Sequence, residues 1–262
     1  MNKAHEIDYK IFGEELQCVE IELDPQETVL AEPGSLMFLT QDIEMHTIFG
    51  DGTNQNAGFL GKLFTAGKRL LTGENLFMTA YTNQGNQKRQ VMFAAPYPGK
   101  VIPLDLTQFG GRVICQKDSF LASARGISIG IEFQKKLGVG LFGGEGFIMQ
   151  KLEGDGMAFV HAGGHVIRRE LQWGEKLRID TGCLVAFAGE VSYDIEFVGG
   201  IKNSLFGGEG LFFATLSGPG TVWLQSLPFS RLAGRIVAAG GFNGQKEEGS
   251  VLGGLGKLID GR

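Results

Sequence analysis

The chain has 262 residues, 43% of them hydrophobic, which is enough to bury the core of one large β domain or of two smaller ones. Its 42 glycines follow no Gly-X-Y period, so they exclude a collagen-like chain and indicate many turns and bends in a folded protein. The net charge of −5 argues against a protein that binds a nucleic-acid backbone, because such a protein needs a basic face, and no nucleic-acid partner is expected.

The N-terminal segment MNKAHEIDYK lacks the apolar core of a signal peptide. No stretch reaches the roughly 18 consecutive apolar residues that a membrane-spanning helix needs. Cys18, Cys115 and Cys183 each lie in apolar, strand-like sequence, which favours buried reduced thiols over a disulfide or a catalytic role. The sequence therefore predicts a soluble cytoplasmic protein, with a peripheral position at the membrane as the alternative.

Three stretches of the chain resemble one another. Residues 17–38 align without a gap with the segment that begins at residue 165, a constant offset of 148 positions. The identities in this alignment are Leu23 with Leu171, Glu27 with Glu175, Gly34 with Gly182 and Leu36 with Leu184. A third copy at 100–123 is expected to place Ile114 opposite Val29, and Leu121 opposite Leu36.

Each copy alternates apolar and polar residues as a half-buried strand does, in segments such as VEIELD, ISIGIEF and VSYDIEF. The turn segments NQGN, EGDG and SGPG fall at equivalent places and predict β-hairpins, because Gly and Asn tolerate positive φ. A last strand is expected within residues 224–236, where it closes a ring by pairing with the N-terminal unit.

The fold class that follows is all-β. We expect three fused β-sandwich or double-stranded β-helix units around a pseudo-threefold axis, in one compact domain of residues 1–262. The units span about 1–98, 99–164 and 165–240, and an amphipathic tail covers 241–262. Two short amphipathic helices, at 58–71 and 250–259, interrupt the β pattern.

Several motifs together resemble one family, namely EPGSLMF, KRLLTGENLFMTAYTN, LFGGEGFIMQ, GEKLRIDTGCLVAF and SLFGGEGLF. This is the mitochondrial biogenesis protein 24 (AIM24) family, also called altered inheritance of mitochondria 24 and long classed as a bacterial domain of unknown function. The resemblance implies a fold similar to the trp RNA-binding attenuation protein (TRAP-like), with three such units in one chain. It also implies that mitochondrial members take part in inner-membrane organisation, and it supplies no catalytic residues.

A Gly-Glu loop recurs in each unit, with its glutamate at Glu74, Glu145 and Glu209. One interpretation is a ligand or metal module, in which three carboxylates meet near the axis and hold a hard cation or a polar ligand. The other is that each glutamate accepts backbone N–H bonds in a tight turn, and repetition in every unit favours this structural role.

Other candidates for chemistry are weak. His161 and His165 have the spacing of half a zinc site, but no second ligand pair accompanies them, and a hairpin tip is the better interpretation. No nucleophile elbow, metalloprotease motif or P-loop is present. The sequence predicts no catalytic residue, no bound metal and no cofactor.

The helix at 58–71 has the composition of an interfacial membrane segment, with phenylalanines and leucines on one side and basic residues on the other. The favoured interpretation of this helix is that it caps the core of the sandwich, because helices of soluble proteins show the same apolar stripe. Gly/Phe-rich connectors recur at the equivalent place in the other two units. The candidate contact residues are Phe59, Lys62, Phe64, Lys68, Arg69, Phe142 and Phe206. The sequence favours a non-enzymatic scaffold or binding module for a partner protein or a membrane surface, and a homo-oligomer is compatible with it.

Overall fold

The structure is a computed structural model that describes residues 3–49, 77–135, 147–197 and 212–239. Contacts divide the chain into two units, Met1–Pro228 and Phe229–Arg262. The first unit contains every described strand, and the described residues of the second form the helix α3 (Phe229–Ala239). The all-β prediction is confirmed, whereas the pseudo-threefold arrangement and its bounds stay predictions.

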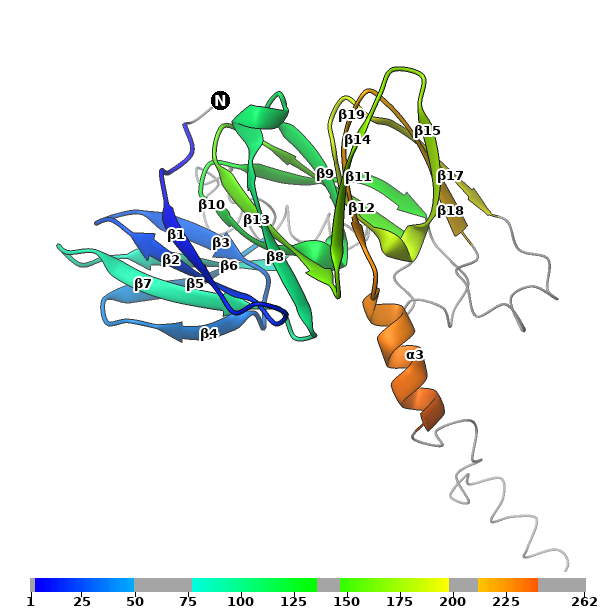
Figure 1. Cartoon of the computed structure of the whole chain (residues 1–262). Coiled ribbons are helices and arrows are strands. Elements are labelled where there is room, and N and C mark those ends of the chain that lie inside the picture. The colour runs from blue at the N-terminus through cyan, green and yellow to red at the C-terminus, as the bar shows by residue number, and fades with distance from the viewer. Residues whose placement is uncertain (1–2, 50–76, 136–146, 198–211, 240–262) are drawn as a thin grey trace, which may run out of the picture. The chain divides into compact units, whose positions relative to one another are not determined.

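Four antiparallel sheets make up the first unit (Figure 1). The first sheet has the order β1-β2-β7-β4, formed by Asp8–Phe12, Cys18–Leu23, Arg89–Ala94 and Leu36–Leu39. The second has the order β5-β6-β3-β10-β13-β8, formed by Ile43–Phe49, Phe77–Asn83, Thr28–Ala31, Phe120–Ala124, Met157–Gly163 and Gly99–Asp105.

The other two sheets lie further along the chain. The third has the order β11-β12-β9-β16-β19-β14, formed by Ser128–Lys135, Phe147–Glu153, Arg112–Gln116, Leu184–Ala188, Gly220–Gln225 and Val166–Leu171. The fourth has the order β15-β18-β17, formed by Lys176–Asp180, Phe212–Ser217 and Ser192–Phe197. Three short 3₁₀ turns, η1, η2 and η3, cover Leu106–Phe109, Lys117–Ser119 and Thr181–Cys183.

One pattern of pairing recurs along the chain. Six strands form a group: three pair as β2-β7-β4 in one sheet, and three pair as β5-β6-β3 in the next. The same order returns as β8-β13-β10 with β11-β12-β9, and again as β14-β19-β16 with β17-β18-β15. We call these sets groups 1, 2 and 3. The second and third sheets therefore each join strands of two neighbouring groups.

A β-bulge marks the same place in each group. It falls between Leu36 and Phe38 in β4, between Phe120 and Ala122 in β10, and between Leu184 and Ala186 in β16. These positions make Phe120, rather than Leu121, the counterpart of Leu36. The alignment predicted from the sequence for residues 100–123 is therefore displaced by one residue. Apolar residues stand next to each other in this segment, so either register fits the alternating pattern.

The turns NQGN, EGDG and SGPG do lie between consecutive strands, but the prediction that they close hairpins is wrong. Each links strands that belong to different sheets; β6 lies in the second sheet and β7 in the first. Turn residues specify only that the chain reverses, whereas the partner of each strand is set by the faces that must be buried.

The strand expected within residues 224–236 is also wrong beyond its first residues. β19 ends at Gln225, and α3 begins at Phe229, directly after Pro228. Proline is compatible with a helix start because the first helical N–H groups lack intrahelical partners. Phe229, Leu232 and Ile236 then follow the spacing of one helix face.

Apolar side chains of the first unit gather into two clusters. The larger joins groups 1 and 2, and its large members include Tyr81 and Phe93, whose rings meet edge to face with centroids 5.1 Å apart. The smaller lies mainly in group 3 and includes Phe187 and Leu216. Burial of these two clusters stabilises the sheets of the first unit.

Candidate functional site

The contact and ligand residues predicted from the sequence lie outside the described residues. They are Glu74, Glu145, Glu209, Phe59, Lys62, Phe64, Lys68, Arg69, Phe142 and Phe206. Whether the three glutamates meet at one point, and which way the phenylalanines face, stay predictions.

The described strands do show where these segments are attached. Residues 50–76 link β5 to β6, residues 136–146 link β11 to β12, and residues 198–211 link β17 to β18. In each case the first strand ends its sheet and the second is its antiparallel neighbour. The three segments therefore connect equivalent strand pairs in the three groups.

Two other repeated glutamates, Glu27 and Glu175, each hold a tight turn. A carboxylate oxygen of Glu27 accepts the backbone N–H of Asp24 at 2.9 Å, and one of Glu175 accepts the N–H of Gln172 at 3.0 Å. The backbone N–H of each glutamate donates back to the carbonyl of the same partner at 3.0 Å. Repetition of a glutamate in this chain thus accompanies a tight turn at these two positions.

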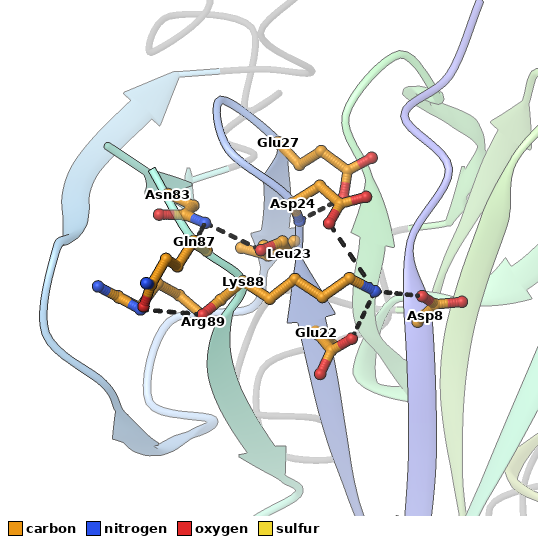
Figure 2. A network of polar contacts seen from close by, with 9 residues as sticks. All are labelled: Asp8, Glu22, Leu23, Asp24, Glu27, Asn83, Gln87, Lys88 and Arg89. Carbon is orange, nitrogen blue, oxygen red and sulfur yellow. Dashed lines mark hydrogen bonds and ion pairs between the residues drawn. The ribbon is translucent and has the colours of Figure 1, made fainter. Parts of the chain in front are cut away.

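Figure 2 shows the cluster of charges around Lys88. Its Nζ atom lies 2.7 Å from a carboxylate oxygen of Glu22, 3.2 Å from one of Asp8 and 3.8 Å from one of Asp24. The hydrogen bonds to Glu22 and Asp8 raise the pKa of Lys88 above its ordinary value. Because all four side chains reach solvent, this cluster is a screened surface network that joins β1, β2 and the turn before β7.

The same view shows how Asn83 holds that turn (Figure 2). Its amide nitrogen donates to the carbonyl oxygens of Leu23 at 2.9 Å and Gln87 at 2.8 Å, and its side-chain oxygen accepts the N–H of Gly85 at 2.9 Å. Asn83 is fully buried. One amide therefore satisfies three backbone groups where the chain passes between two sheets.

His161 and His165 do not form half of a metal site. His161 lies in β13 and is buried, whereas His165 lies between β13 and β14 and is exposed. The segment is no hairpin tip either, because these two strands belong to different sheets. The Tyr97 ring packs edge-on against His161 with centroids 4.6 Å apart, and burial lowers the pKa of His161 to about 4.

The described residues contain no group of three or more His, Cys, Asp or Glu side chains placed to hold a metal ion. Cys115 is buried, and burial raises its pKa to about 12, so its thiol stays protonated. Over the described ranges, no helix is both long and apolar enough to cross a membrane.

The helix α3 carries an exposed apolar face that the sequence analysis missed. Phe229 is 49% exposed and Ile236 is 60% exposed, while Leu232 between them is half-buried. By helix geometry Arg231 lies across the helix from Phe229 and Arg235 lies beside Leu232, and the helix contains no acidic residue. The i, i+3, i+7 spacing was visible in the sequence, but a strand was predicted because the segment occupies the place of residues 95–106, which contain β8.

A second exposed apolar surface lies on β4. Met37 is 55% exposed and Phe38 is 40% exposed, although they occupy a strand of the first sheet. Among the described strands β4 pairs only with β7, so its other edge has no hydrogen-bonded strand in the described part of the chain. An edge of this kind is a template for pairing with another strand.

Comparisons with known proteins agree with one another. Residues 9–227 match the model of the family described as Mitochondrial biogenesis AIM24. An uncharacterized protein of Streptococcus pyogenes serotype M6 is 31% identical over 222 residues, which cover 83% of this chain and 84% of that protein. The crystal structure of protein SPYM3_0169 from Streptococcus pyogenes has a TM-score of 0.71 at 25% identity, covering 89% of this chain and all of that one. The chain belongs to the AIM24 family.

Proposed function

We propose that the protein is a non-enzymatic binding module that attaches to an anionic membrane surface through α3. The observation that carries this proposal is the exposed apolar face of Phe229 and Ile236 on a helix that also carries Arg231 and Arg235. A helix of this kind lies in the plane of the membrane interface, with its apolar face among the acyl chains and its arginines among the headgroups.

The charge of the helix favours a lipid surface that is negative. The two arginines of this helix attract anionic headgroups, and each basic residue near such a surface strengthens binding about fivefold. We propose the connectors as further contacts, since they carry the same residue types at Phe59, Lys62, Phe64, Lys68, Arg69, Phe142 and Phe206. Several weak contacts on one molecule act together through their high effective concentration.

Vesicle flotation of the full chain tests this function. Vesicles of phosphatidylcholine mixed with phosphatidylglycerol are expected to carry the protein upward, and vesicles of phosphatidylcholine alone to carry much less. Added salt weakens the binding, because it screens the arginines. Absence of binding to both kinds of vesicle, or equal binding to both at all salt concentrations, would contradict the proposal.

Substitutions in α3 test whether this helix makes the contact with the lipid. The pair Phe229→Ser and Ile236→Ser is expected to remove most of the binding, and Arg231→Gln with Arg235→Gln to lower it about fivefold for each arginine. The matched control is Trp173→Ser, which removes an apolar side chain that is 87% exposed in the first unit. Equal loss in the control would mean that the lipid contact is not specific to α3.

A further inference from the structure

Groups 1 and 2 join through the antiparallel pair of β3 and β10, and groups 2 and 3 join through β9 and β16. We call each such pair a junction. The segment that precedes β1, residues 3–7, is bound at one end of the first junction, and we call it the strap. Its residues Ala4 and Ile7 are 6% and 8% exposed and belong to the larger apolar cluster.

Three hydrogen bonds hold the strap, and each goes to a different element. The N–H of Ala4 donates to Oδ1 of Asp155, in the turn between β12 and β13, at 2.8 Å. The N–H of His5 donates to the carbonyl of Arg125, directly after β10, at 2.9 Å. The Nδ1 atom of His5 accepts the N–H of Thr28, the first residue of β3, at 2.9 Å. His5 therefore bridges the two strands of the junction.

Two glycines make room for the strap. A Cβ atom at Gly126 would lie 2.7 Å from the Cα atom of Ala4, and a Cβ atom at Gly156 would lie 2.5 Å from the Cβ atom of Ala4. Carbon atoms that are not bonded stay further apart than this, at about 3.5–4.0 Å. Any larger residue at either position would therefore displace the strap.

Groups 1 and 3 fill the equivalent place with a side chain of their own. The residue that corresponds to the first of the two glycines is Asp42 in group 1 and Glu190 in group 3. Each acidic side chain covers the glycine of a nearby turn: Oδ2 of Asp42 would lie 3.0 Å from a Cβ atom at Gly85, and Cγ of Glu190 would lie 3.1 Å from one at Gly220. In group 2 the strap takes that place instead.

The bond to Thr28 requires an uncharged imidazole. A neutral imidazole has one ring nitrogen without a proton, whereas the charged ring carries a proton on both nitrogens and accepts no hydrogen bond. On protonation, Nδ1–H of His5 and the N–H of Thr28 would point at each other, and Thr28, which is 1% exposed, would lose its acceptor. Burial and, after it, the charge of Arg125 lower the pKa of His5 below its ordinary value of 6.5.

The other charged groups near the strap have partners of their own. Lys3 and Glu6, on the strap itself, pair with each other at 2.7 Å. Asp155 and Glu27, from neighbouring turns, each accept a backbone N–H. Arg125 is the charge that acts on the imidazole from the elements packed against it, and its sign opposes protonation.

We propose that the strap is released by acid: protonation of His5 breaks its bond to Thr28 and detaches residues 3–7 from the end of the first junction. Release uncovers the apolar side chains of Ala4 and Ile7. Because the folded chain disfavours the charged imidazole, the strap is fully bound above pH 6.5 and is lost as the pH falls below it. This inference goes beyond the proposed function and does not depend on it.

Amide hydrogen–deuterium exchange of the full chain between pH 7 and pH 4.5 tests the release. Each rate is divided by the intrinsic exchange rate at the same pH, so that structural protection alone is compared. The amides of Ala4, His5 and Thr28 are expected to be protected at pH 7 and to lose protection in acid, while amides in the middle of β3 and β10 stay protected. Protection of Thr28 that does not change with pH would overturn the proposal. Simultaneous loss in the strap and in both strands would also overturn it, because it indicates global unfolding.

Two substitutions separate His5 from other acid-sensitive groups. His5→Asn keeps an acceptor oxygen near the position of Nδ1 but cannot become charged, so its strap should stay protected throughout. Arg125→Gln keeps the backbone carbonyl that binds the strap and removes the repelling charge, so the pKa of His5 rises and release should begin at a higher pH.

The matched control is His165→Asn, which alters an exposed histidine and should release the strap as the wild type does. Release of the wild-type kind in His5→Asn would contradict the proposal. Should His5→Asn fail to fold at pH 7, as judged by circular dichroism, Arg125→Gln decides alone: release at the wild-type pH would then overturn the proposal.

Discussion

At the scale of single residues, the buried polar side chains are the ones whose loss has the clearest outcome. Asn83→Ala removes three hydrogen bonds and leaves the carbonyls of Leu23 and Gln87 without this partner. We expect the free energy of unfolding to fall by about 2–4 kcal/mol, since each buried group left unsatisfied costs about 1–3 kcal/mol. Urea unfolding measures the loss. Gln84→Ala, at the exposed neighbour, should change stability by less than about 0.5 kcal/mol.

Burial of His161 makes the free energy of unfolding depend on pH. Its pKa in the folded chain, about 4, lies below the unfolded value of 6.5, because burial opposes the charged ring. The unfolded chain therefore binds the proton more readily, and the stability due to neutral His161 is complete above pH 6.5 and is lost as the pH falls toward 4. The loss should reach about 3 kcal/mol, at about 1.4 kcal/mol for each pH unit.

Urea unfolding from pH 7 to pH 4 checks this dependence. His161→Leu should flatten the decline between pH 6.5 and pH 4, whereas the exposed His165→Leu should leave it as in the wild type. His5 contributes in the same direction: burial, followed by the charge of Arg125, lowers its pKa, and its Nδ1 accepts the N–H of Thr28 at 2.9 Å. A decline that is unchanged in His161→Leu would show that other groups carry it.

The sequence could identify some of these residues and not others. Glu27 and Glu175 were visible as a repeated pair, because residues that hold equivalent turns recur at a constant offset. Asn83 was visible only as a turn residue; that its amide reaches Leu23, sixty positions earlier, depends on how two sheets meet. The sequence likewise could not predict that His161 is buried and His165 exposed. The residues around the two histidines have a similar composition, although one lies inside a strand and the other beyond its end.

At the scale of elements, the two turns held by Glu27 and Glu175 should respond alike. Glu27→Ala and Glu175→Ala each remove one hydrogen bond to a backbone N–H. We expect each to lower the free energy of unfolding by about 1 kcal/mol, the usual net contribution of one such bond. Chemical denaturation of both variants beside Glu14→Ala, an exposed residue between β1 and β2, measures the effect. A loss at only one of the two turns would show that they are not equivalent.

Strands were predicted more successfully than their connections. Alternation of apolar and polar residues identified β2, β11, β15 and β17, since each has one face on the core and one toward solvent. The same alternation says nothing about which strand lies beside which. The turns between β6 and β7 and between β12 and β13 therefore suggested hairpins, although the strands they link diverge into separate sheets. The helix α3 was missed because its segment takes the place in the repeat that β8 takes earlier in the chain, and the resemblance therefore predicted a strand.

At the scale of the whole molecule, groups 1 and 2 share a sheet, and so do groups 2 and 3. The internal similarity of the sequence pointed to three units, and the recurring pairing is compatible with them. How the groups join was not predicted, although the strands concerned do differ in sequence: β3 (TVLA) and β9 (RVICQ) are mostly apolar, whereas β15 (KLRID) alternates. A matching difference in burial lies in β4, where Met37 and Phe38 are exposed.

The shared sheets also bear on how such a chain changes over evolutionary time. Each junction uses the same pair of strand types, so duplicating or deleting one whole group leaves a chain with the same two ends, β4 at one and a β15-type strand at the other. A gene that encodes two groups or four would therefore need no new kind of junction, because each added group can share a sheet with its neighbour in the way seen here.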